Sequence, residues 1–126
     1  MASIKRFEDV QAWQKSREFI KLIYAETGNG PFAKDYPLKD QTKRAAISIM
    51  LNIAEGFGRK ADKGLKQYLV QAHGSCAEVQ SALYIALDQS YFTENVFKQL
   101  YDSVDEISRM IMGLYNYLIN KGSATL

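Results

Sequence analysis

The sequence predicts an all-α protein, an up-down-up-down antiparallel four-helix bundle. Apolar residues recur with helical spacing in four segments, and only short polar stretches separate most of these segments. No segment alternates apolar and polar residues for long enough to indicate a strand. A chain of 126 residues is long enough for one ordinary domain that needs no disulfide or metal to fold. We therefore expect residues 1–126 to form a single domain.

The first helix is predicted over residues 7–26. Its apolar stripe consists of Val10, Trp13, Ile20 and Tyr24, with Phe19 and Ile23 beside them. Gly28 is well placed to end this helix. Residues 28–37 contain both prolines of the chain and two glycines, which indicates a long loop. We expect the two aromatic residues of this loop, Phe32 and Tyr36, to pack on the bundle.

The other three helices are predicted from Leu38 to Glu55 or Gly56, from Lys63 to Gln89, and from Glu94 to Asn120. Their core stripes are Leu38, Thr42, Ala45, Ile49 and Ile53; Leu65, Leu69, Ala72, Cys76, Val79, Leu83 and Ala86; and Phe97, Leu100, Val104, Ile107, Ile111, Leu114 and Leu118. The alternating steps of three and four residues are typical of helices that pack knobs-into-holes. Short connections make consecutive helices antiparallel neighbours.

Two features of the third and fourth helices favour self-association. Gly74 lies in the middle of the third helix, where glycine costs about 1 kcal/mol relative to alanine. We therefore expect a close backbone approach at Gly74, either by the second helix or by a neighbouring subunit. Tyrosine-rich faces outside the core stripes indicate a protein interface, and they include Tyr68, Tyr84, Tyr101, Tyr115 and Tyr117.

Charge is balanced overall but uneven along the chain. The net charge is +2, whereas residues 34–67 carry eight basic and four acidic residues, and residues 68–120 carry two basic and six acidic ones. The basic segment suits a surface that binds a polyanion, a complementary interface in an oligomer, or a solvated face. The candidate nucleic-acid-binding residues are Lys39, Lys43, Arg44, Arg59, Lys60, Lys63 and Lys66.

A line of polar residues runs beside the core stripe of the second helix. It consists of Gln41, Ser48, Asn52, Glu55 and Arg59, and Ser75 and Glu78 of the third helix are placed to join it. One interpretation is a hydrogen-bonded network in a helix seam or a subunit interface, which we favour for Asn52 and Glu55. The other is a recognition strip in which Arg44 and Arg59 contact phosphates.

No catalytic or metal-ligating set is visible in the sequence. His73 is the only histidine, no Glu-x-x-His motif occurs, and Cys76 lies on a core stripe. The glycines near Arg59 and Lys60 lack the pattern of a phosphate-binding loop. We therefore expect no enzymatic activity, no metal and no cofactor. A single cysteine, the lack of a secretory signal and the lack of a membrane-spanning apolar segment favour the cytoplasm and exclude a membrane partner.

One motif carries a family resemblance. It reads Gln41-x-x-Arg44-Ala45-x-x-Ser48-x-x-x-Asn52-Ile53-Ala54-Glu55-Gly56, followed by Gly58-Arg59, and continues as Tyr68-Leu69-x-x-Ala72-x-Gly74-Ser75-x-x-Glu78. It resembles a family of small bacterial four-helix bundle proteins that are encoded by intervening sequences in 23S ribosomal RNA genes. With Phe7, Trp13 and Tyr24 the resemblance covers nearly the whole chain. It implies a homopentamer around a central channel and no known catalytic activity.

The chain is also similar to the accessory variability proteins of diversity-generating retroelements. That similarity implies a pentamer that binds nucleic acid and a reverse transcriptase through basic surfaces, although the charge of +2 is mild for such a protein. Five copies of the basic segment would form a concentrated basic ring, whose affinity for phosphates falls with salt. Few aromatic residues interleave with the basic ones in residues 39–66, so we expect structured RNA or a duplex to be bound. The alternative is a structural or protein-adaptor oligomer with no nucleic-acid role.

Overall fold

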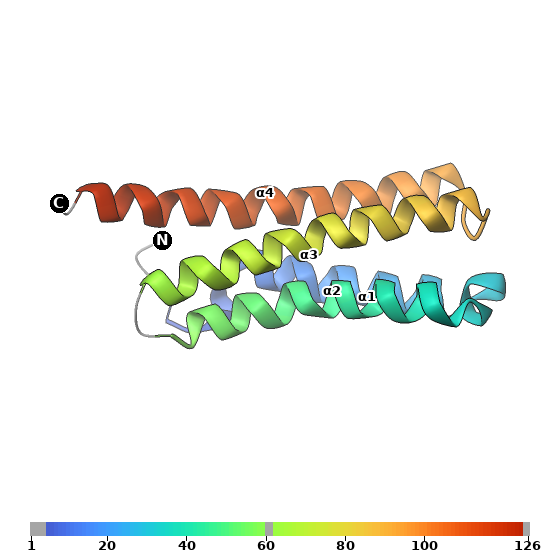
Figure 1. The fold of residues 1–126 in the computed structure, drawn as a ribbon, viewed down its shortest axis with the longest axis horizontal. Helices are drawn as coiled ribbons and strands as arrows, with labels where there is room; N and C mark the ends of the chain where they lie inside the picture. Colours follow the sequence, from blue (N-terminus) through green and yellow to red (C-terminus); the bar gives the residue numbers. More distant parts are fainter. Residues whose placement is uncertain (1–4, 60–61, 125–126) are drawn as a thin grey trace.

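The computed structural model describes residues 5–59 and 62–124, and in these ranges it contains helices and no strand. The elements are η1 (Phe7–Asp9), α1 (Gln11–Thr27), η2 (Gly30–Lys34), α2 (Tyr36–Phe57), α3 (Asp62–Asp88) and α4 (Glu94–Ala124). The four long helices alternate in direction (Figure 1), and each packs against two neighbours: α1 and α3 both contact α2 and α4. The structure therefore confirms the four-helix bundle.

The core is built from the stripes predicted for α2, α3 and α4. Every residue of these three stripes is buried, except that Phe97, near the start of α4, is half-buried. Seven residues make about 1.94 turns of an α-helix, which is close to two full turns, so residues seven apart lie on nearly the same face of the helix. The seven-residue pattern is thus sufficient to define this part of the core.

The first predicted helix differs from the structure in its start and in its buried face. Phe7–Asp9 form a separate 3-10 turn, and Val10 is extended before α1 begins at Gln11. The residues of α1 that are buried are Ala12, Ser16, Phe19, Ile23 and Thr27, whereas Tyr24 is 48% exposed. The hydroxyls of Ser16 and Thr27 donate to the carbonyls of Ala12 and Ile23, both at 2.7 Å, so they enter the core without unpaired polar atoms.

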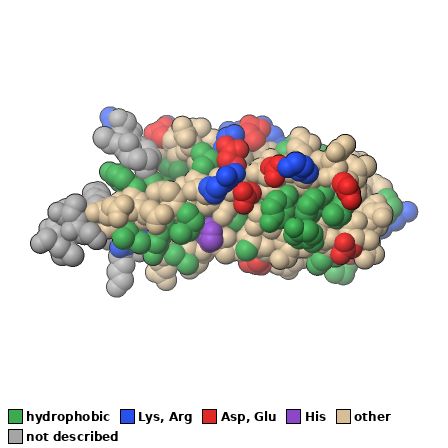
Figure 2. All heavy atoms as spheres, turned by 90° about the horizontal axis from the view of Figure 1, so that it is seen from above, with side chains coloured by type: hydrophobic (Ala, Val, Ile, Leu, Met, Phe, Trp, Pro, Cys, Tyr) green, Lys and Arg blue, Asp and Glu red, His purple; other side chains and the backbone are tan. Residues whose placement is uncertain are grey.

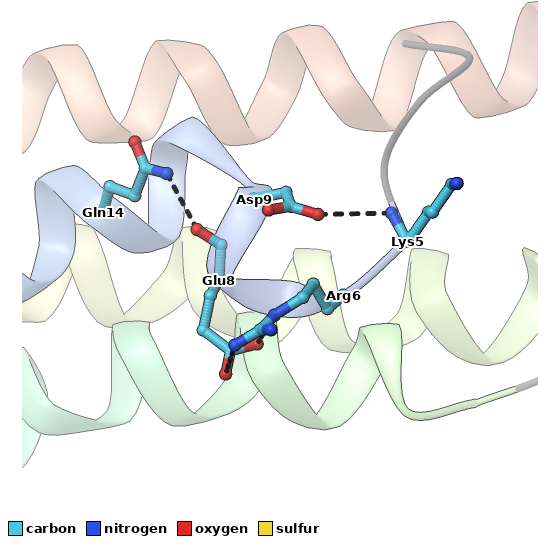
Figure 3. A network of polar contacts seen from close by, with 5 residues as sticks. All are labelled: Lys5, Arg6, Glu8, Asp9 and Gln14. Atoms are coloured by element: carbon cyan, nitrogen blue, oxygen red, sulfur yellow. Dashed lines mark hydrogen bonds and ion pairs between the residues drawn. The ribbon is translucent and has the colours of Figure 1, made fainter.

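Polar contacts hold η1 beside the start of α1 (Figure 3). The side-chain amide of Gln14 donates to the carbonyl oxygen of Glu8 at 2.8 Å, and the backbone amide of Lys5 donates to Asp9 Oδ2 at 3.4 Å. The Arg6 guanidinium donates to both carboxylate oxygens of Glu8, at 3.2 and 2.8 Å. This hydrogen-bonded pair raises the pKa of Arg6 and lowers that of Glu8. Glu8 and Asp9 therefore belong to η1 and not to the first turn of α1.

The loop predicted over residues 28–37 is largely helical. It contains η2, and α2 already begins at Tyr36, with Pro37 in the first turn, where a missing N–H breaks no helical hydrogen bond. Phe32 is buried, as expected, and stacks on Tyr91 with 5.1 Å between ring centroids. The expectation for Tyr36 was wrong: its side chain is 72% exposed, because the first turn of α2 directs it away from the core.

The close approach between α2 and α3 lies at Gly56 and not at Gly74. A Cβ atom on Gly56 would lie 3.0 Å from Leu65 Cδ1 and 3.0 Å from Tyr68 Cβ. A Cβ atom on Gly74 would meet nothing within 4 Å, since Gly74 faces solvent. The predicted approach of the second helix to Gly74 was therefore wrong, and an approach by a neighbouring subunit stays a prediction.

Candidate nucleic-acid interface

The predicted polar line lies in the seam between α2 and α3. The hydroxyls of Ser48 and Ser75 are 2.9 Å apart, and the Asn52 amide donates to the carbonyl and the hydroxyl of Ser48, both at 2.9 Å. Gln41 Nε2 donates to Glu78 Oε2 at 3.4 Å, also across the seam. These groups satisfy one another within the chain, an arrangement that fixes the register of the two helices.

The basic candidates fall into two groups at opposite ends of α2 (Figure 1). Lys39, Lys43 and Arg44 lie in its first three turns, and Arg59 follows its last turn. At 1.5 Å per residue, Lys43 and Arg59 are about 24 Å apart along the helix axis. Lys66 lies near the start of α3 and is half-buried, while Lys60 and the side chain of Lys63 lie outside the described residues. The basic segment is therefore not one patch within a chain.

Near the start of α2 the lysines are not neutralised. Lys43 Nζ lies 4.2 Å from the centroid of the Tyr24 ring on α1, a cation–π contact that positions the ammonium. Among the residues that the structure describes, no carboxylate pairs with Lys39 or Lys43 within 4.0 Å. Arg44 Nε pairs with Asp40 Oδ2 at 2.8 Å, but both side chains are exposed, so this pair is weak. The start of α2 therefore presents positive charge to solvent.

At the other end of α2 the cation is engaged. One nitrogen of Arg59, Nη2, donates to Glu55 Oε1 at 2.8 Å and to the Tyr68 hydroxyl at 2.7 Å. The guanidinium also lies 5.2 Å from the centroid of the Tyr68 ring. The hydrogen bond to Tyr68, together with the charge of Glu55, raises the pKa of Arg59. Glu55 is thus bound to Arg59 and does not join the group of Ser48, Asn52 and Ser75.

An aromatic cluster of three side chains lies on the face shared by α3 and α4. The ring centroids of Tyr84 and Phe97 are 4.9 Å apart, and Tyr101 lies 5.7 Å from Tyr84 and 5.5 Å from Phe97. Tyr84 is 50% exposed, and the other two are half-buried. Figure 2 shows hydrophobic side chains gathered on this face near the end at which α4 begins, with acidic side chains beside them. Burial raises the pKa of Tyr101, helped by Tyr84 and Asp105.

The thiol of Cys76 is not a candidate nucleophile. Cys76 is buried on the core stripe of α3, and burial raises the pKa of its thiol to about 12, so the thiolate is scarce at neutral pH. No group of three or more His, Cys, Asp or Glu residues in the described ranges is arranged to hold a metal ion. His73 is half-buried one turn away from Cys76 on the same helix.

Two aromatic residues beside the basic start of α2 were not among the sequence candidates. Tyr36 precedes Lys39 by three residues and Lys43 by seven, so all three share one face of α2. This spacing is visible in the sequence, so Tyr36 could have been found as a candidate from the sequence alone. Tyr24 reaches Lys43 from α1, and no local pattern indicates that contact.

Comparisons with known proteins identify a family and a fold. The family model described as 23S rRNA-intervening sequence protein matches residues 8–113. A crystal structure of a protein of unknown function from the S23 ribosomal protein family of Bacteroides thetaiotaomicron has a similar fold, with a TM-score of 0.76 and 21% identity. The alignment covers 82% of this chain and 97% of that chain. No curated protein matches the sequence. In the part of the chain that was searched, none of the helices is long and apolar enough to cross a membrane.

Proposed function

The chain belongs to the family of 23S rRNA-intervening sequence proteins, and we propose from this premise that it is a non-enzymatic, oligomeric nucleic-acid-binding accessory protein. In this proposal, residues 1–126 form one domain that acts in the cytoplasm and needs no cofactor. The ligand is a structured RNA, or else a DNA, and it is held by its phosphates. Contacts of this kind give affinity that depends steeply on salt and little on sequence.

The observation that carries the proposal is the basic start of α2. Lys39 and Lys43 have no carboxylate partner within 4.0 Å among the described residues, and Arg44 lies one residue further on with an exposed guanidinium. Positive charges without neutralising partners at fixed positions of a helix face suit a phosphate backbone. The excess of acidic over basic residues lies elsewhere in the chain, since residues 68–120 contain six acidic residues and only two basic ones.

Assembly would strengthen this binding. The family resemblance implies a homopentamer, in which five copies of the basic start of α2 would act on one ligand. The free energies of the phosphate contacts then add, so a surface that binds nucleic acid weakly in one subunit binds it tightly in the assembly. The similarity to the retroelement accessory proteins extends the proposal to one partner protein, a reverse transcriptase that works on the bound nucleic acid.

The test compares two double charge reversals of equal net charge. Lys39→Glu with Lys43→Glu removes the basic start of α2, whereas Lys98→Glu with Arg109→Glu changes two cations of α4 that pair with Asp102 and Asp105. We expect the first variant to lose affinity for a structured RNA by about a hundredfold at low salt and the second by less than fivefold. Fluorescence anisotropy across a salt series measures both. Equal affinities of the first variant and the wild type would overturn the assignment to α2.

The second candidate function is a structural or protein-adaptor oligomer with no nucleic-acid role. The aromatic cluster of Tyr84, Phe97 and Tyr101 favours it, because partly exposed aromatic clusters are typical of protein interfaces. Light scattering of the Tyr84→Ala variant tests whether the cluster holds subunits together. A smaller mass, combined with no RNA binding by the wild type, would favour this second function.

A further inference from the structure

The first two turns of α2 border an open hollow that neither the family match nor the polar network explains. Its volume is about 440 Å³, and it is lined by Tyr36, Pro37, Lys39, Asp40 and Lys43. This volume lies within the range of sites for small ligands. The hollow therefore has room for one planar ring and its substituents.

The groups around the hollow combine one aromatic face with two ammonium groups. The Tyr36 side chain is 72% exposed, and no aromatic pair within the described ranges includes it. Lys39 and Lys43 follow on the same face, about 4.5 and 10.5 Å from Tyr36 along the helix axis at 1.5 Å per residue. Tyr24 positions Lys43 from the neighbouring helix. An aromatic platform beside cations is the combination that binds a base together with its phosphate.

The acidic groups nearby are already bonded. Asp40, which also lines the hollow, pairs with Arg44 at 2.8 Å. The carboxylate of Asp35 accepts one hydrogen bond from the backbone N–H of Leu38 at 3.1 Å and one from the Tyr91 hydroxyl at 2.7 Å. Both donors to Asp35 are neutral, so its carboxylate keeps its charge. Three cations (Lys39, Lys43 and Arg44) against two carboxylates (Asp35 and Asp40) nevertheless leave a net positive charge around the hollow.

We propose that this hollow binds one unpaired nucleotide of a single strand, with the base stacked on Tyr36 and the phosphates held by Lys39 and Lys43. The proposal rests on the proposed function and narrows it, because a base inside a duplex has no free face for Tyr36. It also revises the expectation of duplex binding, which considered only the aromatic residues among positions 39–66. Stacking of this kind tolerates any base, so sequence preference is weak.

The experiment uses a labelled 20-nucleotide single-stranded RNA and the same RNA annealed to its complement. The variants are Tyr36→Ala, Tyr36→Phe, which keeps the aromatic face, and Tyr117→Ala, a control for another exposed tyrosine, on α4. We expect Tyr36→Ala to weaken single-strand binding about tenfold or more and to change duplex binding less than twofold. Tyr36→Phe and Tyr117→Ala should stay within twofold of the wild type on both probes. Circular dichroism verifies that each variant is folded.

A second measurement locates the contact directly. Ultraviolet crosslinking of the single strand containing 5-bromouridine, followed by mass spectrometry, should identify Tyr36 or a neighbour in the first two turns of α2. Equal binding of the single strand by Tyr36→Ala and the wild type would overturn the inference and leave the proposed function in place. Failure of the wild type to bind either probe at low salt would overturn both.

Discussion

The two ends of α2 both carry positive charge, but they are anchored in different ways. At the start, the Asp35 carboxylate caps the helix and accepts the Tyr91 hydroxyl, so an acidic residue makes the connection to the segment between α3 and α4. At the end, the cation itself makes the connection, since Arg59 binds Glu55 and Tyr68. At the start of α2 a carboxylate makes the connection, so the ammonium groups of Lys39 and Lys43 stay available to bind a phosphate. At the end of α2 the guanidinium of Arg59 makes the connection, so it is already occupied.

This difference changes the meaning of the charge count. Residues 34–67 carry eight basic and four acidic side chains, but a count does not distinguish a cation that faces solvent from one that joins two helices. Two groups of basic residues about 24 Å apart along the helix also cannot contact the same phosphate. The relevant quantity is the number of unpaired cations at each end of α2.

The largest expected effect on stability lies at the end of α2, where Gly56 allows the close approach of α3. We expect Gly56→Val to lower the free energy of unfolding by about 1–3 kcal/mol, because the new side chain would overlap Leu65 and Tyr68. Urea denaturation followed by circular dichroism measures this change. An unchanged midpoint would show that α3 moves away at little cost, and that the end of α2 is not tightly anchored.

Removal of the carboxylate at the start of α2 should have a somewhat smaller effect. We expect Asp35→Ala to lower the free energy of unfolding by about 1 kcal/mol, through loss of the cap on the Leu38 N–H. The hydrogen bond to Asp35, together with burial, raises the pKa of Tyr91 above 10.0. A raised pKa favours folding while the hydroxyl is protonated, so this contribution is present below pH 10 and is lost as the pH rises through the higher value.

The pH dependence provides the control for this variant. Ultraviolet titration of the phenols should show the pKa of one tyrosine, Tyr91, returning toward 10.0 in the Asp35→Ala variant. Asp35→Asn keeps an acceptor for the cap and should recover most of the lost stability. If Asp35→Ala left both the titration and the midpoint unchanged, the start of α2 would be held by the packing of Phe32 and Leu38 instead.

Gly74 is the matched comparison for Gly56, because both glycines lie inside helices and only one is in close contact. We expect Gly74→Ala to raise the free energy of unfolding by about 0.5–1 kcal/mol, since the new methyl group meets nothing within 4 Å. Light scattering should show an unchanged mass. A loss of subunits in Gly74→Ala would instead mean that a neighbouring subunit approaches α3 at this position.

The fold could be predicted where the core is made of large apolar residues. The stripes of α2, α3 and α4 repeat with steps of three and four, and a heptad pattern leaves little freedom in which face is buried. On α1, the buried face includes Ala12, Ser16 and Thr27, and a search for large apolar residues therefore placed Tyr24 in the core. Hydroxyls that bond to their own helix are compatible with a core. The apolar residues before and after Thr42 in α2 revealed one such position, but no continuous stripe of large apolar residues marked Ser16 and Thr27 on α1.

The candidate site could be predicted only in part. The sequence indicates which residues are basic and which share a helix face, so Lys39 and Lys43 could be found. Whether a cation is free depends on contacts made by other segments. Tyr68 of α3 binds Arg59, and Tyr24 of α1 contacts Lys43. These contacts depend on side-chain packing in three dimensions, which spacing along the chain does not determine.

The variant with the smallest expected effect on stability, Arg59→Gln, gives the most direct comparison of the two ends of α2. Arg59→Gln should change the free energy of unfolding by less than about 1 kcal/mol, because its pair with Glu55 is exposed. If Arg59 is occupied by Glu55 and Tyr68, this variant should also leave the salt dependence of single-strand binding nearly unchanged. Lys39→Gln, by contrast, should reduce the slope of log affinity against log salt by about 0.7 per lost phosphate contact. Equal reductions in the two variants would mean that Arg59 leaves its partners to bind phosphate, and both ends of α2 would then belong to the interface.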